Sequence, residues 1–164
     1  MPQISPAEFY ALPLRVHSFL ADVPLHDVWA VDLPTYREGV TLSEFLRRAS
    51  EHRSDTADTE INRFPAAARA LFGLRFFLGR ISRLEDEPET AQAASFESRL
   101  TAEDRARSIA ASGTAEGLFR VVYRFENEQL LEIQNRTVHA AALSALTELA
   151  DRYRFYFAVY VRRG

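Results

Sequence analysis

The sequence predicts an α+β fold in which an antiparallel β-meander in the last third of the chain packs against helices from its middle. Residues 153–163 alternate aromatic and β-branched side chains with other residue types, and residues 119–125 repeat the pattern. A period of two with such side chains is typical of strands with a half-buried surface. Residues 64–84 carry apolar side chains at helical spacing. At ~1.5 Å per residue such a helix is about 30 Å long, enough to cross a sheet.

The two clearest strands each gather apolar side chains on one face. In residues 153–163 this face comprises Tyr153, Phe155, Phe157, Val159 and Val161. The opposite face comprises Arg154, Tyr156, Ala158, Tyr160 and Arg162. In residues 119–125 the apolar face comprises Phe119, Val121, Tyr123 and Phe125. Because successive side chains of a strand point to opposite faces, we expect both apolar sets to lie on one side of the meander.

Two further segments complete the predicted meander. The polar residues 126–128 predict a turn before a strand that begins near Leu130. Asn135 and Arg136 either form a hairpin turn, because Asn tolerates the left-handed conformation, or lie within one long strand. Residues 140–149 have good helix propensity, but the short links to clear strands on both sides favour a strand.

Two shorter helices are predicted outside the meander. Residues 41–51 carry an apolar stripe, and either Thr41 or Ser43 can cap the start of this helix. The sequence T-A-E-D at 101–104 is a capping-box pattern, which predicts a helix that continues to about residue 111.

The first residues of the chain are predicted to form a loose terminus followed by a first strand. Residues 1–13 contain three prolines, and we expect them to be loose. Residues 14–21 alternate in side-chain type, which predicts the first strand. Residues 22–33 form either a short helical turn or a strand, with Trp29, the only tryptophan, packed in the core.

Length and composition predict a single globular domain over residues 1–164. A chain of this size buries roughly 70% of its unfolded surface, and 47% of the residues are hydrophobic. The net charge of −3 argues against general affinity for nucleic acid, which requires a basic surface. No apolar stretch approaches the ~20 residues that span a bilayer, and the first residues lack a signal-peptide pattern. We therefore expect a cytoplasmic protein without a membrane span.

The sequence contains none of the patterns that would indicate a metal or a cofactor. There is no cysteine, and the four histidines do not show metal-ligand spacing. The glycine-rich phosphate and dinucleotide motifs and the G-x-S-x-G motif are absent. We expect neither a metal site nor a cofactor.

Three segments of the chain resemble a known protein family. They are H-D-V-W-A-V at 26–31, A-R-A-L-F-G-L-R-F-F-L-G-R at 68–80 and E-I-Q-N-R-T-V-H-A at 132–140. Together they resemble the bacterial family catalogued as domain of unknown function 2867, a family of START-like proteins in the SRPBCC superfamily. The resemblance covers roughly residues 14–163.

The resemblance implies a helix-grip fold, in which a curved antiparallel sheet surrounds a long helix and encloses an apolar cavity. Proteins of the broader superfamily often bind lipids, polyketides or other apolar small molecules, and some are cyclases or hydratases. The family itself implies no established activity.

One departure from the family concerns the end of the chain. Members that it resembles continue into a C-terminal helix that lies across the sheet, whereas this chain stops at Gly164. Without that helix, on the order of several hundred Å² of apolar sheet would stay exposed, which soluble monomers rarely tolerate. We expect a homodimer that buries the open face. In the alternative, the existing helices close the core and the protein is a monomer.

His139 is the most interesting titratable residue of the sequence. In a strand that begins at Thr137, both side chains share a face, and a histidine beside a hydroxyl can orient a ligand carbonyl or act as a general base. The alternative is a core histidine that donates to a backbone carbonyl. Tyr123 and Tyr153 offer hydroxyls on large apolar bodies, which suits a pocket wall or a core edge. The candidate ligand-binding residues are Thr137, His139, Tyr123, Tyr153, Asn135, Phe155 and Phe157.

The function that the sequence predicts is the binding of an apolar small molecule, lipid-like or polyketide-like, between the sheet and the long helix. An aromatic sheet face opposite an apolar helix, with few polar groups between them, is the usual composition of a ligand pocket. One alternative is a cyclase, dehydratase or hydrolase that uses His139 as its acid–base group. The other is an interaction module that uses the uncovered sheet face.

Overall fold

The computed structural model describes residues 2–33, 39–51, 94–116, 119–134, 139–149 and 152–162. The predicted helix at 64–84 and the predicted turn at 135–136 lie outside these residues. The described helices are α1 (Pro6–Tyr10), α2 (Val16–Phe19), α3 (Leu42–Glu51), the 3₁₀ helix η2 (Phe96–Arg99) and α5 (Ala102–Arg107). None of the described helices is long and apolar enough to cross a membrane.

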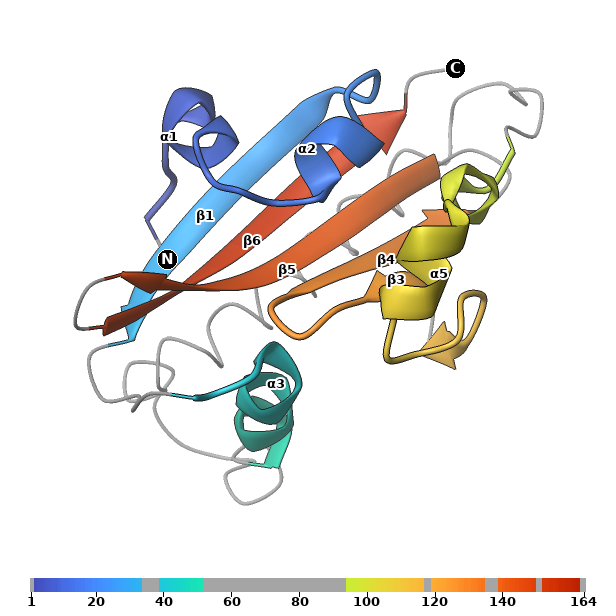
Figure 1. Ribbon diagram of the computed structural model, residues 1–164. Coiled ribbons are helices and arrows are strands. Elements are labelled where there is room, and N and C mark those ends of the chain that lie inside the picture. Colours follow the sequence, from blue (N-terminus) through green and yellow to red (C-terminus); the bar gives the residue numbers. More distant parts are fainter. Residues whose placement is uncertain are drawn as a thin grey trace, which may run out of the picture.

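Six antiparallel strands form one curved sheet, with the order β1-β6-β5-β4-β3-β2 from edge to edge (Figure 1). The strands are β1 (Leu25–Leu33), β2 (Ala115–Glu116), β3 (Phe119–Arg124), β4 (Glu128–Gln134), β5 (His139–Leu149) and β6 (Arg152–Arg162). The predicted α+β class and the meander are confirmed. The strand predicted at 140–149 is also confirmed, because β5 pairs with β6 along its whole length.

The sheet carries buried side chains on both of its faces. The alternation in the sequence predicted instead that one face would be exposed. We call face A the side that carries Tyr156, Ala158 and Tyr160 of β6, and face B the side that carries Phe155 and Phe157. All five side chains are buried. An antiparallel sheet covered on both sides needs apolar residues at successive positions, and β5 and β6 supply them. The predicted exposed apolar face is therefore wrong for the described strands.

A β-bulge in β3 changes which side chains share a face. Val121 lies opposite Leu131, whereas Tyr123 lies opposite Leu130, so one extra residue is inserted between the two pairs. Phe119 and Val121 consequently lie on face B, and Tyr123 and Phe125 lie on face A. The prediction that these four residues point to one side of the meander is wrong, because a bulge reverses the alternation beyond it.

The amino-terminal residues are ordered by a short helix and by pairing with the edge of the sheet. Ser5 caps α1, its hydroxyl accepting a hydrogen bond from the Glu8 amide at 3.2 Å, and Phe9 of α1 is buried in the core. The Ile4 amide donates to the carbonyl of Val28 in β1 at 3.2 Å. The predicted loose terminus at 1–13 is wrong, because these contacts hold the described residues against β1.

The strand predicted at 14–21 is wrong as well, because this segment forms the single-turn helix α2. Edge strand β1 is already paired, through its bridge from Trp29 to Gln3, with the amino-terminal residues. The segment at 14–21 instead crosses face A, where Val16, Phe19 and Leu20 are buried. For residues 22–33 the sequence allows either a helical turn or a strand. The structure shows a strand, because residues 25–33 form β1.

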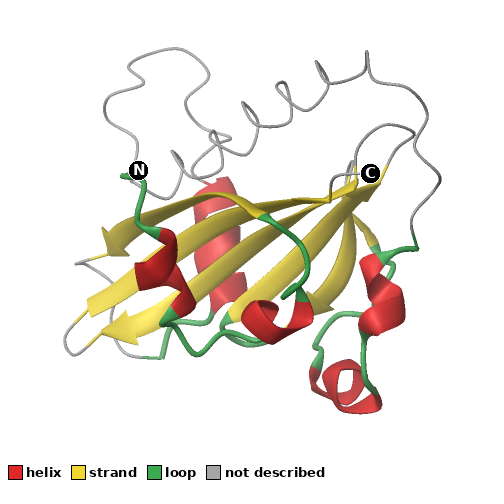
Figure 2. Cartoon of the chain, turned by 90° about the horizontal axis from the view of Figure 1, so that it is seen from above, coloured by secondary structure: helices red, strands yellow, loops and turns green. Residues whose placement is uncertain are grey.

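Four helical elements pack on face A. Figure 2 shows α1, α2, η2 and α5 on the same side of the sheet. Buried rings from three of them enter the core of this face, namely Phe9, Phe19 and Phe96. Small residues line the middle of face A, among them Ala30, Ala141, Ala145 and Ala158. Their small side chains let the helices approach the sheet closely.

Helix α3 packs on face B, where the Phe45 ring lies 4.9 Å from the Phe155 ring. This helix is confirmed at its predicted place, and Thr41 is the cap, because its hydroxyl accepts from the Glu44 amide at 3.2 Å. The capping box at 101–104 is also confirmed.

Helix α5 ends at Arg107 rather than near residue 111 as predicted. The Ile109 amide donates to the carbonyl of Arg124 at 2.8 Å, and the Gly113 amide donates to Val121 at 2.7 Å. Pairing with β3 thus replaces helical hydrogen bonds and covers the edge of this strand, which would otherwise invite another chain.

Candidate functional site

Two glutamates of β4 are buried on face A, beneath the short helices that cover it. Glu128 and Glu132 are four positions apart, so their side chains leave the strand on the same face. Each is 3% exposed. A carboxylate removed from water in this way requires several hydrogen-bond donors.

Glu132 accepts three hydrogen bonds, two from the start of η2 and one from β5. The Ser95 hydroxyl donates at 2.6 Å and the Phe96 amide at 2.9 Å. The third partner is His139, whose Nε2 lies 2.5 Å from the carboxylate. Burial by itself would raise the pKa of Glu132, but the hydrogen bonds from His139, Ser95 and Phe96 outweigh burial and lower it. An ionised Glu132 requires the proton of His139 to be on Nε2.

The His139 ring is held between Glu132 and an aromatic ring. His139 is 7% exposed and stacks on Phe96, with ring centroids 4.1 Å apart. The guanidinium groups of Arg99 and Arg162 lie within 5.5 Å of the same Phe96 ring. Among the described residues, Nδ1 of His139 has no hydrogen-bond partner. Nε2 of the histidine therefore binds a carboxylate rather than the predicted backbone carbonyl.

Glu128 repeats the arrangement at the start of α2. Its carboxylate accepts from the backbone amides of Arg15 and Val16, both at 2.8 Å, and from the Tyr123 hydroxyl at 2.5 Å. Burial raises the pKa of Tyr123 far above its usual value, and the neighbouring Glu128 raises it further. The hydroxyl therefore stays protonated and donates to Glu128 at every physiological pH.

The Arg15 side chain extends this cluster to α5. It donates to both carboxylate oxygens of Asp104, at 2.8 and 2.9 Å. The hydrogen bond from Arg15 lowers the pKa of Asp104 to about 2, aided by hydrogen bonds from Thr101. Glu128, Arg15 and Asp104 thus join the sheet, α2 and α5 through charge-assisted hydrogen bonds.

The aromatic candidates lie on the other side of the sheet. The Tyr153 hydroxyl accepts from the Gly39 amide at 3.0 Å. The indole of Trp29 stacks on Phe157, with ring centroids 5.8 Å apart and an interplanar angle of 22°. Three apolar side chains on the strands of face B are only partly buried, namely Trp29, Ile133 and Val161. Both buried glutamates of β4 lie on face A, whereas the buried polar residue of β4 on face B is the uncharged Gln129.

The structure therefore separates the predicted site residues into two groups. His139 and Tyr123 lie on face A, where each binds a glutamate. Tyr153, Phe155 and Phe157 lie on face B. Asn135 and Thr137 lie outside the described residues.

The sequence prediction also missed the partners of these residues, above all Glu128 and Glu132. One signal could have found them. In the segment E-Q-L-L-E-I at 128–133, both glutamates are an even number of positions from Leu130. In a strand they therefore lie on the same face as Leu130, which is expected in the core.

Comparison with known proteins identifies the family of the chain. Residues 19–163 match the family described as "Protein of unknown function (DUF2867)". No curated protein matches the chain, and no solved structure matches it. The match covers far more than half of the sequence and includes β1, α3 and the whole sheet. The chain is therefore a member of the DUF2867 family.

Proposed function

We propose that the protein binds an apolar small molecule, lipid-like or polyketide-like, against face B. The observation that carries the proposal is the partly exposed Trp29, stacked on the buried Phe157 beside further apolar side chains. An indole with one accessible side on an apolar surface suits contact with a flat or aliphatic ligand.

A second apolar group lies further along face B, at Val161 of β6, four residues beyond Phe157, and on the strands next to it. Ile133 and Val161 both lie opposite Ala140, on either side of it. Ala140 is fully buried, and Ile133 and Val161 are partly buried around it. Small and branched aliphatic side chains on the same face as an aromatic pair present a surface that prefers apolar ligands to water. Of the predicted residues, Phe155, Phe157 and Tyr153 belong to this face.

The START-like helix-grip arrangement belongs to the same proposal. It requires a long helix over the concave side of the sheet, and residues 64–84 are the predicted helix. The family membership and the antiparallel sheet support it. A bacterial source and a cytoplasmic location stay predictions.

A ligand panel tests the proposal. Fatty acids and polycyclic apolar compounds are added to the full chain, and the melting temperature is measured. Binding to the native state alone adds ~2.7 kcal/mol at a hundred dissociation constants, which for a chain of this size is a rise of roughly 5–10 °C. Native mass spectrometry of the purified protein looks for a copurified compound. No shift with any compound and no bound mass would contradict the proposal.

Two matched variants locate the site. Val161→Gln places an amide at the margin of face B, and Tyr10→Gln makes the similar loss of an apolar surface group on α1. The first is expected to weaken binding at least tenfold, because an amide in the contact is poorly hydrogen-bonded. The second is expected to leave it unchanged. Equal effects of the two variants would place the ligand elsewhere.

Acid–base chemistry at His139 is the second candidate function. The specific observation is the His139–Glu132 pair at 2.5 Å together with the Nδ1 atom that has no described partner. A histidine oriented by a carboxylate is a common general base. Geometry favours binding on face B, because His139 is buried beneath η2 and its Nε2 is already used.

A further inference from the structure

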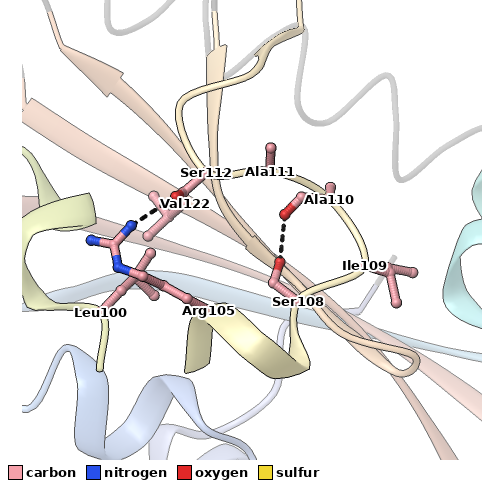
Figure 3. Close-up of a pocket in the computed structure, with 8 residues that line it drawn as sticks. All are labelled: Leu100, Arg105, Ser108, Ile109, Ala110, Ala111, Ser112 and Val122. Carbon is pink, nitrogen blue, oxygen red and sulfur yellow. Dashed lines mark hydrogen bonds between the residues drawn. The ribbon is translucent and has the colours of Figure 1, made fainter. Parts of the chain in front are cut away.

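A second surface feature lies between α5 and the segment that follows it. It is a groove of about 280 Å³, shown with its lining side chains in Figure 3. The lining residues are Leu100, Arg105, Ser108, Ile109, Ala110, Ala111, Ser112 and Val122. Its volume is just below the range of about 300–1,000 Å³ that holds drug-sized ligands, so it suits a smaller molecule.

One charged side chain lines the groove. Arg105 of α5 donates from Nη1 to the Ser112 hydroxyl and from Nη2 to the carbonyl of Glu97, both at 3.1 Å. These two hydrogen bonds fix the guanidinium beside the groove, and Figure 3 shows it reaching toward Ser112. The Glu97 carboxylate forms an ion pair with this guanidinium at 3.7 Å, a distance too long for a direct hydrogen bond. The guanidinium keeps further N–H groups that a ligand can reach.

The hydroxyls of the groove are less available than this guanidinium. The Ser108 hydroxyl donates to the carbonyl of Ala110 at 2.7 Å and accepts from the Arg124 amide at 3.0 Å. The Ser112 hydroxyl accepts from Arg105. A polar ligand group is therefore expected to bind the cation.

The remaining lining is apolar, and part of it is exposed. Leu100 and Val122 are buried at 9% and 1% exposure. Ile109 is 65% exposed, and apart from Tyr10 it is the only exposed large hydrophobic side chain of the described residues. Ala110 and Ala111 contribute only small side chains to the lining. Figure 3 shows the Ile109 side chain at the far end of the lining from Arg105 and pointing away from it, so a compact ligand at Arg105 would pack against the nearer apolar residues.

We propose that this groove binds a small organic carboxylate, with the carboxylate at Arg105 and a compact apolar body against the apolar lining of the groove. Guanidinium groups bind carboxylates with two parallel hydrogen bonds, which a neutral ligand cannot match. This proposal does not use Trp29 or Phe157, so it would hold even if no ligand bound beside them.

The test compares a carboxylate with its neutral isostere. The ¹⁵N-labelled full chain is titrated with benzoate and, separately, with benzamide, and amide shifts of residues 100–112 are followed. Benzoate is expected to saturate, with benzamide at least tenfold weaker, because only benzoate is charged. Equal affinities, or no saturable shift in the groove, would overturn the proposal.

Variants link the binding to the groove. Arg105→Gln removes the cation and is expected to weaken benzoate at least tenfold. Arg107→Gln is the matched control, because Arg107 lies on the same helix but packs over the Phe125 ring, outside the groove lining. Unchanged affinity in Arg105→Gln, or an equal loss in Arg107→Gln, would overturn the proposal.

A second variant leaves the cation in place. Ala111→Leu fills the groove with an aliphatic side chain while Arg105 keeps its partners. The expected result is a loss of benzoate binding of at least tenfold with an unchanged melting temperature. Retained binding in a folded Ala111→Leu protein would show that benzoate binds outside the groove.

Discussion

Each buried glutamate of β4 accepts three hydrogen bonds, and these donors make burial of its carboxylate tolerable. If one donor is removed, the carboxylate keeps its other hydrogen bonds, but one oxygen is left without a partner in apolar surroundings. That unsatisfied oxygen lowers the stability of the folded chain. The partners Tyr123 and His139 are therefore expected to matter first for stability. This structural role competes directly with the ligand-binding role that the sequence predicted for both.

Replacing His139 by alanine tests the two roles. The variant loses a hydrogen bond to Glu132 and the ring that stacks on Phe96, so the free energy of unfolding should fall by about 1–3 kcal/mol. Urea unfolding at neutral pH measures it. His26→Ala is the control, because the His26 side chain is exposed at the start of β1 and its replacement should cost no more than about 0.5 kcal/mol. If His139→Ala lowers the free energy of unfolding no more than His26→Ala does, the ligand-binding role of His139 would be favoured over the structural one.

His17 predicts a dependence of stability on mildly acidic pH. Burial lowers its pKa below 6.5, although the Phe9 and Leu12 carbonyls act in the opposite direction. The ring packs against Phe9 and Tyr10, with ring centroids at 4.8 and 5.2 Å. The unfolded chain therefore binds the proton more readily than the folded chain. The contribution of a neutral His17 is complete above pH 6.5 and is lost as the pH falls towards the lower folded pKa.

The matching measurement uses His17→Leu, which cannot titrate. Unfolding free energies of both proteins are compared between about pH 7.5 and pH 5. The wild type is expected to lose stability relative to the variant as the pH falls. A constant difference would show that His17 has the same pKa in the folded and unfolded chains.

At the scale of elements, the helices α2 and η2 are too short to be stable by themselves. Isolated helices under about 12 residues are marginal in water, since few internal hydrogen bonds offset the cost of nucleation. Glu128 of β4 binds the first amides of α2, which has no side-chain cap of its own, so the strand supplies the cap. Glu132 binds the Phe96 amide of η2, which Ser95 also caps. This explains why 14–21 forms a helix despite its alternating sequence.

Glu128→Gln should release the start of α2. The neutral amide accepts less strongly than a carboxylate, and one of its groups cannot accept at all. We expect unfolding to be easier by about 1–3 kcal/mol and hydrogen exchange to be faster at residues 15–20. Glu126→Gln is the control, because Glu126 is exposed in the neighbouring turn. Unchanged exchange in α2 would contradict the capping role.

The link from α2 to α5 predicts a loss of stability in acid. The pKa of Asp104 is lowered from 3.8 to about 2 by Arg15, so its contribution is complete above pH 3.8 and is lost as the pH falls towards 2. At about 1.4 kcal/mol per pKa unit this contribution is roughly 2 kcal/mol. The stability difference between wild type and Asp104→Asn should shrink over that interval. A difference that does not depend on pH would contradict the lowered pKa.

At the scale of the whole molecule, the sheet has an apolar core on each side. Short helices cover face A, and α3 packs on face B, so the described strands present no bare apolar face. Edge strand β1 is also paired with the residues around Gln3, and the part of β3 that β2 does not cover is paired with the segment after α5. Such edges are poor templates for another strand.

The homodimer stays a prediction, and it no longer rests on an exposed face of the described strands. A dimer would have to use another surface, and a stable one buries on the order of 1,200–2,000 Å² in total. Sedimentation at low micromolar concentration decides. A concentration-independent dimer supports the prediction, and a single monomeric species with no binding of a hydrophobic dye would refute it.

The sequence by itself determined the elements whose signals are local. The period of two placed β3 and β6, short links placed β5, and the caps at Thr41 and 101–104 placed the starts of α3 and α5. These predictions succeeded because alternation and capping depend on residues within a few positions of one another.

Only the tertiary structure decided how these elements use their side chains. The bulge at Val122 turned Tyr123 to face A, away from Tyr153. Helix α5 ends at Arg107 because the residues that follow it pair with β3. Part of the segment 14–21 forms a helix because Glu128 binds its first amides. Each outcome depends on a hydrogen-bond partner that is distant in sequence, or on register with a neighbouring strand. The predicted site was divided between two faces for the same reason, since strand pairing settles which side chains meet.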